Sequence, residues 1–129
     1  MPKKAITTPK AKAIGPYSAA VASGDLVFVS GQIALDSVAG KLVEGDIAAQ
    51  TRQSLENLQT ILAAAGLTFA HVVKTTIFLT SMGDFAAVNT VYQSYLAEPY
   101  PARSTIAVAA LPMGAKVEIE MVASRSAAT

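Results

Sequence analysis

The sequence predicts an α+β fold in which two helices cover one face of a sheet. Residues 46–65 and 81–96 carry apolar side chains at helical spacing. Residues 26–33, 72–79 and 116–123 instead alternate between apolar and polar side chains or are rich in β-branched ones, as strands are. Because the helices are inserted among the strands and the last two strands follow each other directly, the order of elements indicates an α+β sheet with its helices on one face.

The N-terminal part is predicted to turn at residues 14–16 and then to run through small residues, 18–22, whose state the sequence leaves ambiguous. Gly24 and Asp25 form a hairpin turn into a strand over residues 26–33. Alternation along this strand predicts one face of Leu26, Phe28, Ser30 and Gln32 and an opposite face of Val27, Val29 and Ile33. A further turn is expected at residues 39–40.

Asp46 is predicted to cap the first helix, which ends near Ala65 and is stopped by Gly66. The apolar stripe of this helix recurs at helical spacing, so it should face the core. Its members are Ile47, Thr51, Leu55, Leu58, Leu62 and Ala65.

The second half of the chain is predicted to begin with a central strand over residues 72–79, because this segment is strongly β-branched. The second helix opens at Ser81 or at Asp84. Two closing strands, expected to be neighbours in the sheet, are predicted over residues 103–110 and 116–123. The residues of the second helix expected to face the core are Phe85, Val88, Tyr92 and Leu96.

The composition indicates one domain over residues 1–129, with residues 1–13 as a loose lead-in. Charged residues make up 15% of the chain and apolar ones 52%, against a typical charged fraction of about 25%. No run approaches the ~20 apolar residues that a membrane span requires. The excess apolar surface therefore favours a subunit interface, since obligate interfaces resemble a core cut in half.

Several function classes are disfavoured by what the chain lacks. It has no cysteine, no cluster with metal-ligand spacing, no phosphate-binding glycine loop and no Ser-His-Asp order, so we expect no metal and no cofactor. A net charge of +1 gives no field for nucleic acid or membrane, although Lys3, Lys4, Lys10 and Lys12 cluster near the N-terminus. His71, the only histidine, is expected on an exposed connection. Without a secretory or transit pattern, the expected location is cytoplasmic.

Arg103 is the first candidate site residue. Pro99 and Pro101 stiffen its approach, because each fixes its own φ and restricts the residue before it. An arginine leaving such a segment can bind a ligand carboxylate with two parallel hydrogen bonds. A surface salt bridge is the alternative explanation. Thr105 shares the strand face of Arg103, so the two side chains should project together.

Glu118 and Glu120 are the candidate carboxylates. Alternation places them with Lys116 on one face of the last strand, opposite Val117, Ile119 and Met121. This is the pattern of a sheet with one solvated face. If both helices cover the other face, however, the glutamates would line a cleft against a partner subunit.

The chain resembles the Rid family, the reactive intermediate imine deaminases also called YjgF-type proteins, and within it the RidA-type deaminases. The blocks that carry the resemblance lie at residues 14–17, 29–33, 53–58, 73–76, 85–89, 101–104 and 117–119, with Leu111. They span nearly the whole chain in order. The resemblance implies a chorismate-mutase-like fold with a mixed sheet, assembled as a homotrimer around a central β-barrel with active sites between subunits.

The resemblance also implies roles for individual residues. Arg103 would bind the substrate carboxylate, and Glu118 would position the attacking water and move its proton. Ser30, Gly31 and Tyr17 would shape the pocket and bind the imine nitrogen or the water. From the residues alone, Ser30 is also explained as a satisfied core hydroxyl and Tyr17 as packing. Two further residues match family positions: Asn89, read as a helix-to-sheet hydrogen bond or a site-edge residue, and Thr105, where many relatives have cysteine.

The implied activity is the hydrolysis of 2-imino acids or their enamine tautomers, such as 2-aminoacrylate, to 2-keto acids and ammonia, without a cofactor. Two alternatives stay open. One is a ribonuclease or translation inhibitor, which the absence of a concentrated basic surface and of a second histidine disfavours. The other is a non-catalytic trimer that binds a small carboxylate or holds unfolded clients, which would need Arg103 but not Glu118.

Overall fold

The computed structural model describes residues 2–128, and its main feature is a mixed sheet with the strand order β1-β2-β3-β8-β6-β7. Strands β6 and β7 are parallel, and the other neighbours are antiparallel. The six strands are β1 (Lys4–Ile6), β2 (Ala20–Ser23), β3 (Leu26–Gln32), β6 (Val72–Leu79), β7 (Ala102–Ala107) and β8 (Val117–Ser124). A separate two-stranded ribbon pairs β4 (Leu35–Asp36) with β5 (Lys41–Leu42).

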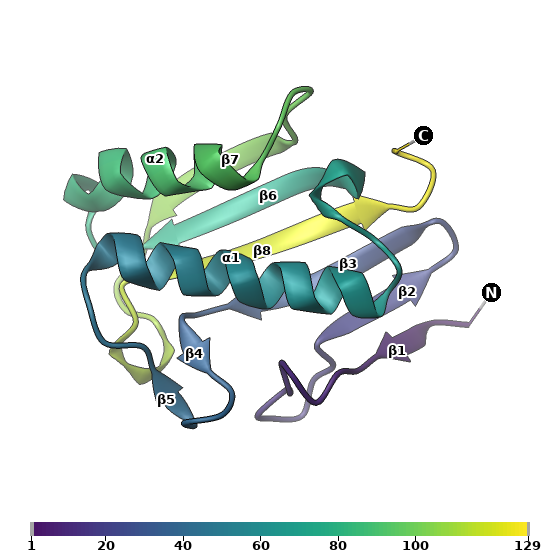
Figure 1. Ribbon diagram of the computed structural model, residues 1–129, viewed down its shortest axis with the longest axis horizontal. Helices are drawn as coiled ribbons and strands as arrows, with labels where there is room; N and C mark the ends of the chain where they lie inside the picture. Colours follow the sequence, from purple (N-terminus) through teal and green to yellow (C-terminus); the bar gives the residue numbers. More distant parts are fainter. Residues whose placement is uncertain (1, 129) are drawn as a thin grey trace.

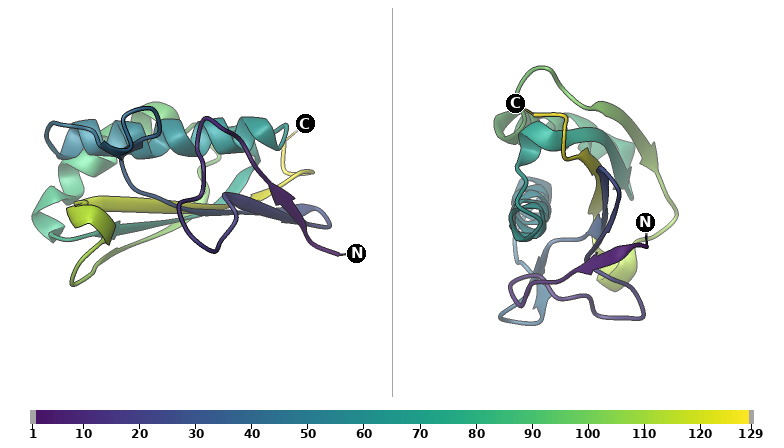
Figure 2. Two further views of the ribbon diagram at one scale, coloured as in Figure 1. Left: turned by 90° about the horizontal axis from the view of Figure 1, so that it is seen from below. Right: turned by 90° about the vertical axis from the view of Figure 1, so that its right-hand side faces the viewer.

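Two helices, α1 (Ile47–Ala64) and α2 (Phe85–Tyr95), lie side by side on one face of the sheet (Figures 1 and 2). This confirms the predicted α+β layers. Three short 3₁₀ helices occupy connections: η1 (Phe69–His71), η2 (Met82–Asp84) and η3 (Pro112–Gly114).

The predicted ends of α1 are confirmed. The Asp46 side chain accepts a hydrogen bond of 3.0 Å from the Ala49 N–H, which satisfies one of the free donors of the first turn. Gly66 has φ +77°, the left-handed conformation that favours glycine after a helix. Helix α1 therefore begins and ends where its capping residues predict.

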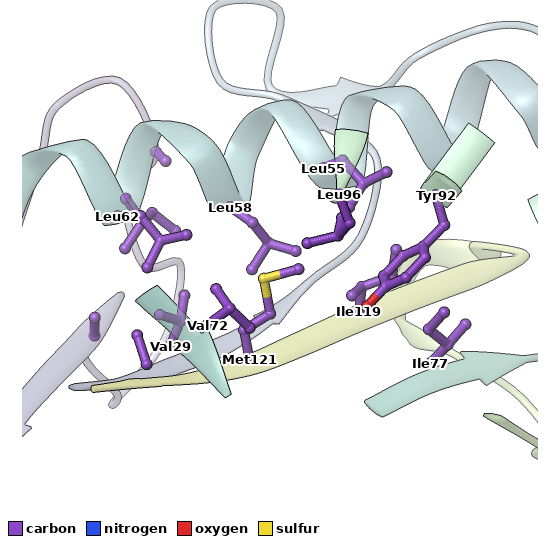
Figure 3. Close-up of a cluster of buried hydrophobic side chains, with 14 of the residues drawn as sticks. Val29, Leu55, Leu58, Leu62, Val72, Ile77, Tyr92, Leu96, Ile119 and Met121 are labelled. Atoms are coloured by element: carbon purple, nitrogen blue, oxygen red, sulfur yellow. The ribbon is translucent and has the colours of Figure 1, made fainter. Parts of the chain in front are cut away.

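The core lies between the two helices and the sheet, as Figure 3 shows around Met121. Leu55, Leu58 and Leu62 of α1 are fully buried there, and each buried leucine contributes about 1.5–3 kcal/mol to folding. The sheet residues opposite them come from three central strands. They include Val29, Ile77, Ile119 and Met121.

The opposite face of the sheet is covered by neither α1 nor α2 (Figure 2). We call it the open face. Strand register assigns to it Leu26, Phe28, Lys74, Thr76, Phe78, Ser104, Ile106, Glu118, Glu120 and Val122. Leu26 is 39% exposed, and Phe28 and Ile106 are each 46% exposed. The open face is thus partly apolar, and the predicted alternation of β3 is confirmed from Leu26 to Val29. It was wrong for Gln32, because a register shift after Val29 pairs Gln32 with Ile119 on the helix side of the sheet.

Four further sequence-based expectations were wrong. The lead-in is not loose throughout, because Lys4–Ile6 pairs with β2. The two closing strands do not pair with each other: β7 joins the sheet beside β6, while β8 inserts between β3 and β6. Strand β7 also ends at Ala107 rather than at residue 110. Finally, Phe85 is 37% exposed instead of facing the core.

Candidate active site

Arg103 lies on β7 and is held from the helix side of the sheet by α2. Its Nη1 donates a hydrogen bond of 2.8 Å to Oδ1 of Asn89. Its Cζ lies 5.0 Å from the ring centroid of Tyr92 and 5.7 Å from that of Phe85, distances at which a guanidinium is attracted to an aromatic face. Residues 85, 89 and 92 share one face of α2, so a single helix surface surrounds the guanidinium.

A pocket of about 370 Å³ opens beside this guanidinium. Its lining residues are Asn89, Tyr92, Gln93, Tyr100, Pro101 and Arg103. The amide of Asn89 takes one of the five N–H donors of the guanidinium. Within residues 2–128 the hydrogen-bond partner of Arg103 is an amide and not a carboxylate, so its positive charge suits an anionic ligand in the pocket.

Tyr92 links this cluster to the sheet. Its hydroxyl donates a hydrogen bond of 3.0 Å to Oγ1 of Thr75 on β6. Burial raises the pKa of Tyr92. The hydrogen bond to Thr75 and the charge of Arg103 lower it, but by less. The phenol is therefore neutral near pH 7 and serves as a donor.

Glu118 lies on β8, on the open face, and its side chain covers Gly31 of β3. A Cβ atom at Gly31 would lie 2.7 Å from Oε2 of Glu118 and 2.9 Å from its Cδ, so only glycine leaves room for this carboxylate. The pairing of β3 with β8 shifts register between Val29 and Gln32, which places Gly31 in an irregular stretch of the strand. Burial, and secondly the charge of Glu120, raise the pKa of Glu118 above its usual value of 4.5.

Ser30 lies within this stretch of β3, and Tyr17 lies in the loop before β2. The Ser30 hydroxyl donates to the Ser18 carbonyl at 2.6 Å, so it has a backbone partner. Tyr17 is 49% exposed and accepts a hydrogen bond of 3.4 Å from the Ile14 N–H. The bond of Ser30 fits a satisfied hydroxyl, and the bond of Tyr17 fits a local contact within the loop that leads into β2.

Thr105 shares the helix side of β7 with Arg103. Its Oγ1 is buried and has no hydrogen-bond partner within residues 2–128. A buried hydroxyl without a partner costs stability. Among the site residues that the sequence indicated, Thr105 is the one with a buried polar side-chain atom that lacks a hydrogen-bond partner within residues 2–128.

The structure groups these residues into two clusters. Arg103, Asn89 and Thr105 lie on the helix side of the sheet, whereas Glu118 and Gly31 lie on the open face. Register proves the separation: Arg103 pairs with Thr75 and Glu118 with Phe78, and residues three apart on β6 point to opposite faces. One copy of the chain therefore does not place the guanidinium and the carboxylate in one pocket.

Three polar residues of α1 that the sequence did not single out bind backbone near the site: two of them after Gly31, and the third just before β8. Ser54 Oγ donates to the Gln32 carbonyl at 2.9 Å. Asn57 Nδ2 donates to the carbonyls of Ile33 at 3.2 Å and Leu35 at 2.9 Å. Gln50 accepts a hydrogen bond of 3.0 Å from the Lys116 N–H. The signal was present in the sequence: these polar residues interrupt the buried stripe of α1 beside its leucines.

His71 and the possibilities of a metal site and a membrane span remain to be described. His71 lies at the end of η1, where its Nδ1 accepts a hydrogen bond of 3.0 Å from the Thr68 N–H; it is a capping residue of a connection. Across residues 2–128 there is no group of three or more His, Cys, Asp or Glu side chains that could hold a metal ion. In the same part of the chain, both helices are too short or too polar to cross a membrane.

Comparison with known proteins gives matches over nearly the whole chain. Residues 7–125 match the family described as Endoribonuclease L-PSP. Protein DfrA of Myxococcus xanthus is 53% identical over 126 residues, which cover 95% of this chain and 96% of that protein. The 2-iminobutanoate/2-iminopropanoate deaminase of Mus musculus is 48% identical over 122 residues, which cover 94% of this chain and 90% of the mouse protein.

Solved structures agree with these matches. YyfA of Yersinia pestis, described as a protein of unknown function of the conserved Rid family, has a TM-score of 0.90 at 46% identity, over 95% of this chain and 99% of that one. TdcF of E. coli, solved with bound serine, has a TM-score of 0.89 at 43% identity, also over 95% and 99%. The fold and the sequence therefore point to the same group of proteins.

Proposed function

Because this chain belongs to the Rid family, whose members are also called YjgF-type or endoribonuclease L-PSP proteins, we propose that it hydrolyses reactive 2-imino acids to 2-keto acids and ammonia. The proposed substrates are 2-iminobutanoate and 2-iminopropanoate, the latter with its enamine tautomer 2-aminoacrylate. One observation carries this choice: the Arg103 guanidinium, bonded to an amide, lines a pocket of about 370 Å³. Such a pocket suits a small α-carboxylate.

In this proposal Arg103 binds the substrate carboxylate. A planar guanidinium can bind both carboxylate oxygens at once, which fixes the orientation of the imine carbon two bonds away. Asn89 holds the guanidinium from one side. Thr105, whose hydroxyl is free of other partners within residues 2–128, supplies a further polar contact beside Arg103.

Glu118 acts on the water. Its carboxylate takes a proton as the water oxygen attacks C2 of the imine, and the electrons of the C=N bond move to nitrogen. That proton is passed to the nitrogen, which takes up a second proton from solvent and becomes an ammonium group. The C–N bond then breaks with its electrons moving to nitrogen, ammonia leaves, and the new hydroxyl loses its proton to Glu118, which returns it to solvent. A raised pKa suits this task, because a base that works near neutral pH is more effective when its own pKa approaches that pH.

The two residues meet only if two copies of the chain build the site. The open face offers the surface for this assembly, since Phe28 and Ile106 are each 46% exposed on it. We place Arg103 of one subunit opposite Glu118 of the next, in a homotrimer whose sheets surround a central barrel. Ser30, Gly31 and Tyr17 then border the water and the imine nitrogen. In this proposal the trimer works in the cytoplasm, beside pyridoxal-phosphate enzymes that release such imines.

A competition assay tests the proposed activity. Threonine and a purified threonine dehydratase generate 2-iminobutanoate, and semicarbazide traps it as a semicarbazone. We expect the wild type to suppress trapping and Arg103→Ala to fail to do so. Unchanged trapping in the presence of a folded, oligomeric wild type would reject the deaminase proposal.

The names and structures of other family members suggest two alternative functions that experiments must distinguish from imine hydrolysis. A carboxylate-binding protein without catalysis is supported by the Arg103 pocket alone and by the serine bound in the structure of TdcF. In that case Glu118→Gln would leave the biological function intact. A ribonuclease, as the family description states, would instead show RNA binding that falls steeply with salt.

A further inference from the structure

Tyr92 occupies a central place in the Arg103 cluster that core packing alone does not explain. It is 5% exposed and extends from α2 toward the sheet (Figure 3). Its ring faces the guanidinium carbon at 5.0 Å, while its hydroxyl is bonded to Thr75. One side chain thus contacts both the cation and the strand beside it.

Thr75, which accepts the hydrogen bond of Tyr92, lies directly beside Arg103 in the sheet. Thr75 is the register partner of Arg103 on the neighbouring parallel strand. The Tyr92 hydroxyl is therefore fixed at the backbone position directly beside Arg103, and the ring cannot move along the strand without breaking that bond. Asn89, three residues earlier on the same helix, binds Nη1.

An arginine side chain has many rotamers, and a bidentate carboxylate contact requires one of them. The Asn89 amide restrains the guanidinium at one edge, and the Tyr92 ring restrains its plane, because guanidinium groups stack on aromatic faces. Phe85 is a weaker third contact at 5.7 Å, since it is itself 37% exposed.

We propose that Tyr92 is a positioning residue that holds the Arg103 guanidinium in the orientation needed to bind the substrate carboxylate, with Thr75 as the anchor of its hydroxyl. This rests on the proposed function of Arg103 as a carboxylate-binding residue. Tyr92 acts through Arg103 and takes no part in the proton transfers assigned to Glu118. Its loss should therefore raise KM and leave kcat nearly unchanged.

Two variants dissect the contacts of Tyr92. Tyr92→Phe keeps the ring and removes the bond to Thr75, so KM should rise by about threefold. Tyr92→Leu also removes the aromatic face, so KM should rise by about tenfold. The dissociation constant of 2-ketobutanoate, measured by calorimetry, should rise by the same factors, and kcat should stay within twofold. Thr75→Val removes the anchor while keeping the ring, and it should match Tyr92→Phe.

Tyr95→Phe is the matched control. It deletes the same hydroxyl from the same helix, where the ring packs edge-on against Phe69 at 6.3 Å, and it should leave KM and kcat unchanged. A double-mutant cycle gives the decisive test. In the Arg103→Lys background, which keeps a cation but lacks the planar guanidinium, Tyr92→Phe should change kcat/KM by less than twofold, because the group that Tyr92 orients is gone.

Equal effects of Tyr92→Phe with and without Arg103 would overturn the proposal, as would a folded Tyr92→Leu with wild-type KM. If the wild type binds 2-ketobutanoate but hydrolyses no imine, the deaminase proposal fails. The role of Tyr92 is then tested by the dissociation constants of 2-ketobutanoate for the wild type and the Tyr92 variants. If the wild type binds no carboxylate, both proposals are rejected.

Discussion

Arg103 on β7 and Glu118 on β8 point to opposite faces of the same sheet. Their register partners on β6, Thr75 and Phe78, are three residues apart and so face opposite ways. Arg103 is surrounded by α2, whereas Glu118 lies on the open face above Gly31. A reaction that uses both side chains therefore needs a second copy of the chain, and several predictions depend on this geometry.

Gly31→Ala should reduce activity much more than stability. The added Cβ would lie 2.7 Å from Oε2 of Glu118, so the flexible carboxylate must move aside while the backbone stays in place. A displacement of this size should lower kcat by about tenfold or more. Steady-state kinetics and thermal unfolding measure both effects. Gly83→Ala, at a glycine without positive φ in η2, is the control; equal kinetics of the two variants would contradict the assigned position of Glu118.

On acidification, the activity should be lost at a higher pH than it would be if Glu118 titrated like an ordinary glutamate. Burial and Glu120 raise the pKa of Glu118, and the base form is required for the attack of water. The acid inflection of kcat should therefore lie above pH 4.5. Glu120→Gln removes the neighbouring charge and should move the inflection to lower pH. An inflection that does not respond to this substitution would assign the titration to another group.

Glu118→Gln should stabilise the protein at neutral pH. A carboxyl whose folded-state pKa is raised favours folding fully below its unfolded pKa, and this contribution is lost as the pH rises through the folded-state value. At pH 7 the wild type thus carries the cost of a partly buried charge that the amide lacks. The variant should have the higher Tm at pH 7, and the difference should vanish below about pH 4. A lower Tm at pH 7 would show that the charged form has a stabilising partner.

Asn57→Ala should destabilise the fold by about 2 kcal/mol, because it removes two hydrogen bonds to backbone carbonyls, those of Ile33 and Leu35. Both carbonyls lie directly after the Gly31 stretch, so activity should fall as well. Urea unfolding measures the free energy. Gln59→Ala, an exposed amide on the same helix, should cost less than ~0.5 kcal/mol. Similar losses for both variants would mean that the Asn57 bonds contribute little.

The local structure of this chain could be predicted well from its sequence. Helix α1 begins at Ile47 after the cap Asp46, and β6 spans Val72–Leu79 as the β-branched run indicated. Such features depend on neighbouring residues, which the sequence displays directly. The positions of capping residues and the period of apolar residues are local properties of this kind.

The strand order could not be predicted in the same way. Residues 103–110 and 116–123 follow each other in the chain and suggested neighbouring strands, yet β7 pairs in parallel with β6. The crossover through α2 explains this, since a strand, a helix and a second strand commonly form a parallel unit. Strand β8 then fills the place between β3 and β6.

The arrangement of the site depends on this order. Alternation within each strand correctly paired Arg103 with Thr105 and Glu118 with Glu120. Only the register between strands shows that the two pairs face opposite sides. The role of Phe85 was hidden for a similar reason: its apolar side chain fits a core position in the helical pattern but lies 37% exposed beside a cation.

Subunit complementation tests the central claim most directly. Arg103→Ala and Glu118→Gln chains, each inactive in the semicarbazide assay, are unfolded, mixed in equal amounts and refolded together. If each site takes Arg103 from one subunit and Glu118 from the next, random mixing leaves about one quarter of the sites intact. The refolded mixture should therefore recover about one quarter of the wild-type activity. A refolded, oligomeric mixture with no more activity than its separate components would contradict a site shared between two copies.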